Sequence, residues 1–142
     1  MTEESGQPLP AIERDTAFHA VLVVDDEPLV RGAIKAILEA QGYRVVVAPE
    51  GHAALEAFSQ QNFDIALLDL GLPGMNGYQV AEQMKMLKPG VPIILVTGWG
   101  NEADRDRMAR SGIHSVVPKP FGPSLLLSAI EAALGGHSSP PV

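Results

Sequence analysis

Short apolar runs alternate along the chain with longer stretches of mixed polar and apolar residues. Five of these runs are rich in β-branched residues and predict strands: AVLVVDD, RVVVA, DIALLD, PIILVT and HSVVP. Each run is almost continuously apolar, which is typical of strands in a parallel sheet that is covered on both faces. The sequence therefore favours a buried sheet over a half-exposed one.

The stretches between and after these runs carry apolar residues at helical spacing. The first begins at Pro28, which suits the first turn of a helix, and ends before Gly42. The third ends before Pro89, and the fourth is the polar stretch NEADRDRMARS, residues 101–111. Leu125 and Leu127 fall outside the apolar stripe of the last helix. Either they leave apolar surface exposed, or, as the simpler expectation, Leu125 packs where that helix begins.

Strands that alternate with helices predict βα units and a parallel sheet. The expected fold is α/β: a flavodoxin-like, doubly wound, five-stranded parallel sheet of order 2-1-3-4-5 with five helices. We assign this domain to residues 19–134. The segments 1–18 and 135–142 are rich in Pro, Gly and polar residues, and we interpret them as flexible tails. In such folds ligands bind beyond the carboxyl ends of the strands, at the topological switch point.

Acidic, hydroxyl and basic side chains lie at the carboxyl ends of four of the predicted strands. Asp25 and Asp26 end the first, Asp69 the third and Thr97 the fourth, and the fifth leads into Lys119. Carboxylates that converge raise one another's pKa unless a cation intervenes. Oxygen ligands are also what Mg²⁺ prefers. We therefore expect a hard divalent cation, Mg²⁺ or Mn²⁺, among Asp25, Asp26 and Asp69.

A metal ion, an ammonium group and a hydroxyl around one carboxylate would form a site for a phosphoryl group. The cation and Lys119 would neutralise its oxygens, Thr97 would donate a hydrogen bond, and Asp69 would be the nucleophile. A single acid at a strand end is more often a helix cap or a solvated residue. The hypothesis rests on the combination of four strand ends.

Composition and charge exclude several other kinds of function. The formal net charge is −7, the pI is about 4.9, and Lys and Arg form no cluster, which argues against direct binding of nucleic acid. The chain has no Cys, so disulfides, thiolate metal sites and a Cys nucleophile are ruled out. No apolar run approaches the roughly 20 residues of a membrane helix, and the N-terminus lacks a signal-peptide pattern. We expect a soluble, cytoplasmic protein.

The segments VLVVDDEP, DIALLDLGLPGMNG, PIILVTGWG and VVPKPF resemble, in this order, the signatures of receiver domains of bacterial response regulators. The resemblance covers roughly residues 20–134. It implies that Asp69 is phosphorylated by a histidine kinase or a histidine phosphotransfer protein, without turnover of an external substrate. It also implies that Asp26 and Asp69 bind Mg²⁺ directly with the backbone carbonyl of Gly71, whereas Asp25 acts largely through water.

The resemblance assigns further roles close to the phosphoacceptor. Thr97 and Lys119 would hold the phosphoryl oxygens, together with the backbone N–H groups of Leu70 and Gly98. Pro120 follows Lys119 as in the family, where this peptide bond is typically cis, an isomer that only an X-Pro bond makes accessible at low cost.

Two positions bear on how such a domain would switch. The family usually has Tyr or Phe three residues before the conserved Lys, and Val116 stands there in this chain. Because valine has a stiff χ1, it cannot swing in and out like an aromatic ring. Trp99, beside the expected pocket, would shield the phosphoaspartate or contact the kinase, or would be a partly buried loop side chain. The face made by helix 4, strand 5 and helix 5 is a possible homodimer surface by the same resemblance.

Two alternative functions remain at this stage. A phosphatase or hydrolase with an Asp nucleophile would place an acid two residues after Asp69, and Gly71 stands there instead. A receiver that only binds partners would not need a complete pocket, and every pocket residue is present. Whether the domain is a stand-alone regulator or part of a larger protein, such as a hybrid kinase, is left open.

Overall fold

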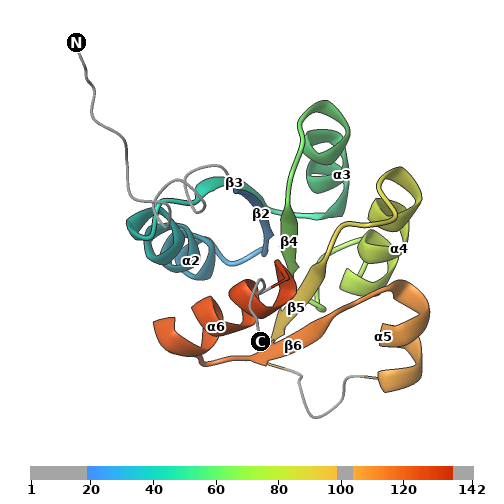
Figure 1. The fold of residues 1–142 in the computed structure, drawn as a ribbon. Helices are drawn as coiled ribbons and strands as arrows, with labels where there is room; N and C mark the ends of the chain where they lie inside the picture. Colours follow the sequence, from blue (N-terminus) through green and yellow to red (C-terminus); the bar gives the residue numbers. More distant parts are fainter. Residues whose placement is uncertain (1–18, 99–103, 136–142) are drawn as a thin grey trace.

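The computed structural model describes residues 19–98 and 104–135 (Figure 1). The predicted tails at 1–18 and 136–142 lie outside these ranges, so the domain boundaries remain predictions. In chain order the described elements are β2 (Ala20–Val24), α2 (Pro28–Ala40), β3 (Arg44–Ala48), α3 (Gly51–Gln60), β4 (Ile65–Leu68), α4 (Gly77–Leu87), β5 (Ile93–Thr97), α5 (Arg105–Ser111), β6 (Ser115–Pro118) and α6 (Pro123–Ala133).

The strands form one parallel five-stranded sheet of order β3-β2-β4-β5-β6. This is the predicted order 2-1-3-4-5, and the fold class is confirmed. After β3 the chain crosses β2 and continues on its other side with β4, so the switch point lies between β2 and β4. Because Val24 pairs with Leu68 in register, these two strands end at the same level.

Alternate residues of the strands point to opposite faces and build two separate cores. Leu22, Ala66 and Leu95 pack in the core beneath α3 and α4, whereas Val23 and Leu67 pack in the core beneath α2 and α6. Figure 1 shows α2 and α6 on one face of the sheet and α3, α4 and α5 on the other. Burial on both faces explains why the strands are continuously apolar.

Two details of the helices differ from the sequence predictions. Helix α5 begins at Arg105, because the Asp104 side chain accepts the Arg107 N–H at 3.1 Å and caps the helix. The predicted residues 101–103 lie outside the described ranges. Leu125 is 48% exposed, so the expectation that it packs where α6 begins is wrong, and the alternative of exposed apolar surface holds for this residue. No helix within the described residues is both long and apolar enough to cross a membrane.

Candidate functional site

Backbone hydrogen bonds bring the ends of β2 and β4 together. The Asp69 N–H donates to the Val24 carbonyl at 2.9 Å, and the Asp25 N–H donates to the Ala48 carbonyl at 3.2 Å. These bonds extend the sheet by one residue, so Asp25 and Asp69 leave neighbouring strands side by side. This is the switch point at which the sequence predicts the site.

Three carboxylates meet at this edge of the sheet. Oxygens of Asp25, Asp26 and Asp69 lie within 4.8 Å of one another. Asp25 and Asp69 are buried, at 1% and 7% exposure, whereas Asp26 is exposed. Their convergence is what the sequence predicts. An oxygen-only donor set of this kind fits a hard cation, because two buried carboxylates so close together need positive charge between them.

Lys119 reaches this cluster from β6. Its ammonium donates to Asp25 Oδ2 at 2.8 Å and lies 3.5 Å from both Asp69 Oδ2 and Glu27 Oε1. Burial lowers the pKa of the ammonium, but the carboxylates of Asp25, Asp69 and Glu27 outweigh this effect, so the pKa of Lys119 lies above its ordinary value. The Lys119 ammonium is therefore a permanent positive charge, and it lies closer to Asp25 than to Asp69.

The carboxyl group of Asp69 is held in an environment that disfavours its charge. Burial raises the pKa of Asp69 above 3.8, and the negative charge of Asp25 adds to the increase. Lys119 and the Gly71 N–H, which lies 3.4 Å from Asp69 Oδ1, act in the opposite direction without cancelling it. An additional cation beside Asp69 would relieve this imbalance.

The loop after β4 packs against the beginning of α4. Asn76 and Gln79 form a capping box, with Asn76 Oδ1 accepting from the Gln79 N–H at 3.0 Å. The Gly77 N–H donates to the Leu70 carbonyl at 3.0 Å. A Cβ at Gly77 would lie 2.6 Å from the Asp69 carbonyl oxygen, so only glycine allows this approach. Gly71, in contrast, has open space around its Cα.

The remaining predicted residues surround the cluster. Thr97 is fully buried at the end of β5, and its carbonyl accepts the Lys119 N–H at 3.0 Å. The Lys119–Pro120 peptide bond is cis, as the resemblance implied. Val116 is half-buried against the core beneath α3 and α4. Trp99 lies outside the described residues, and its predicted role is not tested.

The structure adds two residues that sequence reasoning did not assign to the site. Glu27 contributes a carboxylate 3.5 Å from the Lys119 ammonium, and Arg31 donates from its guanidinium to the Asp25 carbonyl at 2.7 Å. Glu27 stands directly after the acidic pair, which was a visible signal. Arg31 lies in the first turns of α2, where helical geometry turns it back towards the strand end.

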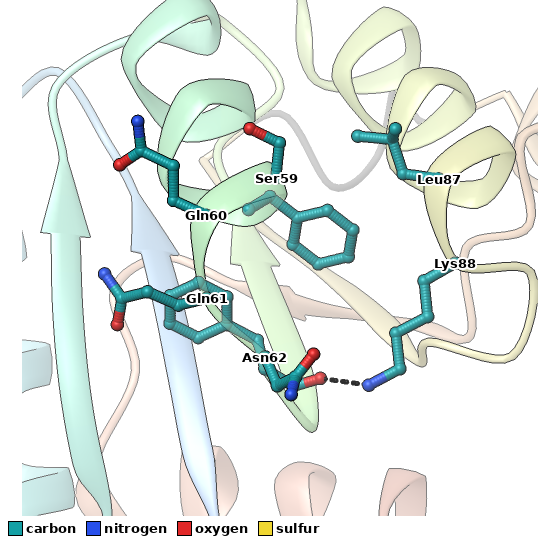
Figure 2. A pocket seen from close by; sticks show the side chains of 8 residues that line it. Ser59, Gln60, Gln61, Asn62, Leu87 and Lys88 are labelled. Atoms are coloured by element: carbon teal, nitrogen blue, oxygen red, sulfur yellow. Dashed lines mark hydrogen bonds between the residues drawn. The ribbon is translucent and has the colours of Figure 1, made fainter.

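Two cavities show where other molecules have access. One of about 510 Å³ lies near the start of β4, at the opposite edge of the sheet (Figure 2). Its Lys88 ammonium donates to the Phe63 carbonyl at 2.6 Å and thereby links α4 to the segment before β4. The other, of about 430 Å³, is mostly apolar and lies beside Lys119. Its lining comprises Leu29, Val30, Ala33, Ile37, Lys119, Pro120 and Phe121. Lys119 lines this second cavity and also donates to Asp25, so the cavity adjoins the aspartate cluster, which is the candidate site.

Comparisons with known proteins agree with this geometry. A family model described as the response regulator receiver domain matches residues 21–131. A probable transcriptional regulator ycf27 of Guillardia theta is 39% identical over 114 residues, which cover 80% of this chain and 44% of that protein. The chain spans about half the length of the curated relatives it matches, at 44%, 47% and 55% for three of them.

Solved structures show the same fold in single receiver domains. A response regulator receiver domain protein from Methanospirillum hungatei has a TM-score of 0.77 at 31% identity, covering 83% of this chain and 94% of that one. The receiver domain of the sensor histidine kinase PA1611 from Pseudomonas aeruginosa, with a magnesium ion coordinated in its active site cleft, has a TM-score of 0.76 at 28% identity. The coverage there is 82% of this chain and 98% of that one.

Proposed function

This chain belongs to the response regulator receiver domain family of two-component systems, and we propose that it accepts a phosphoryl group on Asp69. One observation carries the proposal. The buried carboxylate of Asp69 lies at the switch point of the sheet, within 4.8 Å of two further aspartates and 3.5 Å from the Lys119 ammonium. Negative charge for a metal ion and positive charge for phosphoryl oxygens are thus gathered around one potential nucleophile.

The proposed metal ligands are Asp26 and Asp69 directly, the backbone carbonyl of Gly71, and Asp25 largely through water. The donor set supports Mg²⁺ or Mn²⁺, because every donor is a hard oxygen and the cluster carries more negative charge than Lys119 balances. A bound Mg²⁺ would neutralise the carboxylates and the oxygens of the incoming phosphoryl group. The openness around Gly71 leaves space on that side of the pocket.

The proposed reaction is a transfer between two side chains. An Asp69 carboxylate oxygen forms a bond to phosphorus while the phosphorus–nitrogen bond of a phosphohistidine breaks, and the electron pair returns to the imidazole. The product is an acyl phosphate. Lys119 and Thr97 would hold its oxygens, together with the backbone N–H groups of Leu70 and Gly98. The burial that raises the pKa of Asp69 also makes the ionised carboxylate more basic, which suits a nucleophile.

We propose a histidine kinase or a histidine phosphotransfer protein as the donor. The apolar cavity beside Lys119 supports docking of such a protein, because it lies next to the pocket and its rim includes Leu29, which is 89% exposed. A partner that covers this surface would bring a histidine to the side of Lys119. In the absence of a basic cluster in the sequence, direct binding of nucleic acid by this domain is not part of the proposal.

We also propose a homodimer surface, made of α5, β6 and α6. Support comes from Leu125, which is 48% exposed on α6. Because the curated relatives are about twice as long, the chain is consistent with a receiver from a larger protein as well as with a stand-alone regulator. A cytoplasmic location suits a phosphoryl donor of either kind, and we propose it on that ground.

Incubation with acetyl phosphate and Mg²⁺, followed by intact mass measurement, tests this function. The expected result is a phosphoryl adduct that EDTA prevents and Asp69→Asn abolishes. Asp64→Asn is the matched control, since Asp64 precedes the same strand at its other end and accepts the Ala20 N–H at 2.7 Å. It should leave the adduct unchanged.

The same experiment separates the alternatives. Release of phosphate from acetyl phosphate without an adduct would favour a hydrolase with an Asp nucleophile. The absence of both products, with acetyl phosphate and with a phosphorylated kinase, would favour a domain that only binds partners. The family relatives are regulators, and Gly71 occupies the place where a hydrolase of this type has its acid.

A further inference from the structure

The turn between β2 and α2 carries Asp26, the least supported of the three clustered aspartates. Asp25 and Asp69 are buried, and both form ion pairs with the Lys119 ammonium. Asp26 is exposed, and within the described ranges no hydrogen bond or ion pair reaches its carboxylate. The direction of the Asp26 side chain therefore depends on the backbone of the turn.

Two hydrogen bonds hold this backbone. The Glu27 N–H donates to Asp25 Oδ1 at 2.9 Å, and the Arg31 guanidinium donates to the Asp25 carbonyl oxygen at 2.7 Å. That carbonyl belongs to the planar peptide unit that extends to the Cα of Asp26. Holding the oxygen thus fixes the peptide plane from which the Asp26 side chain departs.

The place of Arg31 near the start of α2 is not what the helix alone favours. A cation close to the beginning of a helix opposes the helix dipole, and the first turn of α2 has neither an acidic residue nor a side-chain cap that would compensate. Helical side chains point back towards the N-terminus, which lets the half-buried Arg31 reach the end of β2. Its charge-assisted bond to the Asp25 carbonyl offsets the unfavourable position.

We propose that Arg31 is a positioning residue, which holds the Asp25 carbonyl and thereby sets the Asp26 carboxylate in place as a ligand for the divalent cation. The inference rests on the function proposed above, in which Asp26 binds the metal ion directly. The positive charge of Arg31 repels any cation in the cluster. The contribution of Arg31 through geometry therefore has the opposite sign to its contribution through charge.

This opposition of signs makes the proposal testable. Arg31→Met removes the donor and the charge but keeps an unbranched side chain that suits a helix. Loss of the charge alone would tighten the binding of Mg²⁺. Groups that orient metal ligands contribute roughly 10- to 100-fold to metal affinity. Because the lost charge acts in the other direction, we expect Arg31→Met to bind Mg²⁺ about tenfold more weakly, at the lower end of this range.

The test is a titration of the ¹⁵N-labelled chain with Mg²⁺, followed by the backbone amide resonances of the β2–α2 turn. The same spectra report whether each variant is folded. Lys35→Met is the matched control, because Lys35 lies one turn further along α2 and pairs with Glu39 at 2.8 Å, away from the turn. It removes the same charge from the same helix and should leave the affinity for Mg²⁺ unchanged or slightly higher.

Arg31→Gln is a second variant with the same expected weakening, because its side chain is too short to reach the Asp25 carbonyl. Unchanged or tighter Mg²⁺ binding in the Arg31 variants would show that Arg31 does not position Asp26 and would overturn the proposal. Equal weakening in Lys35→Met would overturn it as well, since the loss would then have no connection with the turn.

The reaction with acetyl phosphate supplies a measurement that a merely structural defect would not reproduce. In Arg31→Met the Mg²⁺ concentration that gives half the maximal rate should rise about tenfold, whereas the rate at saturating Mg²⁺ should stay close to native. A lower maximal rate at an unchanged half-saturating concentration would contradict the role of Arg31. If the native chain binds Mg²⁺ but forms no adduct, the proposed function fails, and the amide titration still decides the role of Arg31.

Discussion

Gly77 is the position where one added methyl group tests the construction of the site most directly. A Cβ there would lie 2.6 Å from the Asp69 carbonyl oxygen, 3.0 Å from the Leu70 Cα and 3.1 Å from the Leu95 Cδ1. The first two atoms belong to the backbone of the loop that carries the proposed phosphoacceptor. No side-chain rotation relieves these contacts, so Gly77→Ala must move the loop.

The size of the movement follows from the distances. A Cβ atom essentially never comes within 3.0 Å of another heavy atom and is crowded up to 3.4 Å, so the Asp69 carbonyl oxygen, at 2.6 Å, has to move by roughly 0.5–1 Å. Overpacking of this kind costs about 1–3 kcal/mol, and replacing a helical glycine by alanine returns about 0.5–1 kcal/mol. We therefore expect Gly77→Ala to lower the free energy of unfolding by about 1 kcal/mol.

The expected effect on the reaction is larger than the effect on stability. A displacement of about 1 Å near reacting groups costs up to about 100-fold in rate, so phosphorylation by acetyl phosphate should slow by roughly 10- to 100-fold. Urea unfolding measures the stability, and the rate of appearance of the phosphorylated mass measures the reaction. The signature is a loss of rate that exceeds what unfolded protein would explain.

Gly32→Ala is the matched control for this prediction. Gly32 lies inside α2, is exposed, and has no atom within 4 Å of a Cβ. Alanine there should raise the free energy of unfolding by about 0.5–1 kcal/mol and leave the rate unchanged. A Gly77→Ala variant that is as stable as Gly32→Ala, or is phosphorylated at the native rate, would refute the reasoning.

Two further predictions concern the charges of the cluster. Lys119→Met should lower the free energy of unfolding in EDTA by about 3 kcal/mol, because it leaves the buried carboxylate of Asp25 without its cationic partner. Mg²⁺ should restore part of this loss. A loss below about 1 kcal/mol, measured by chemical denaturation, would contradict the prediction. Asp69→Asn should raise the free energy of unfolding at pH 7 in EDTA, since burial raises the pKa of Asp69 and its ionised form therefore opposes folding. At low pH the Asp69 carboxyl is protonated in the folded and the unfolded state, and the cost of burying its charge disappears. The stability gained by Asp69→Asn should therefore shrink as the pH falls towards 3.8. A stability gain that does not depend on pH would show that the charge of Asp69 is not its cause.

Much of the site could be predicted because a parallel sheet converts sequence position into spatial position. Asp25, Asp69 and Thr97 each follow or end a buried strand, and the carboxyl ends of parallel strands share one edge. The carboxyl ends of these strands could also be predicted, because an acidic residue that follows an apolar run marks the end of a buried strand. The convergence of the aspartates needed no knowledge of side-chain packing.

Other features depend on contacts between distant segments and had no readable signal. Lys119 bonds to Asp25, 94 positions away, more closely than to Asp69, and the strand pattern could not rank these two carboxylates. The exposure of Leu125, in contrast, did have a readable signal, because this residue falls outside the apolar stripe of α6.

The sequence by itself therefore determined the order of elements, the edge of the sheet that carries the chemistry and the residue types gathered there. The tertiary structure decided how closely these residues approach and what holds the surrounding helices. The 2.6 Å limit at Gly77 and the contact of Tyr78 with Asp104, 26 positions away, both arise where α4 packs against its neighbours. Periodicity fixes which face of an element is buried, but the depth and rotation of its packing are set only when all the elements are assembled.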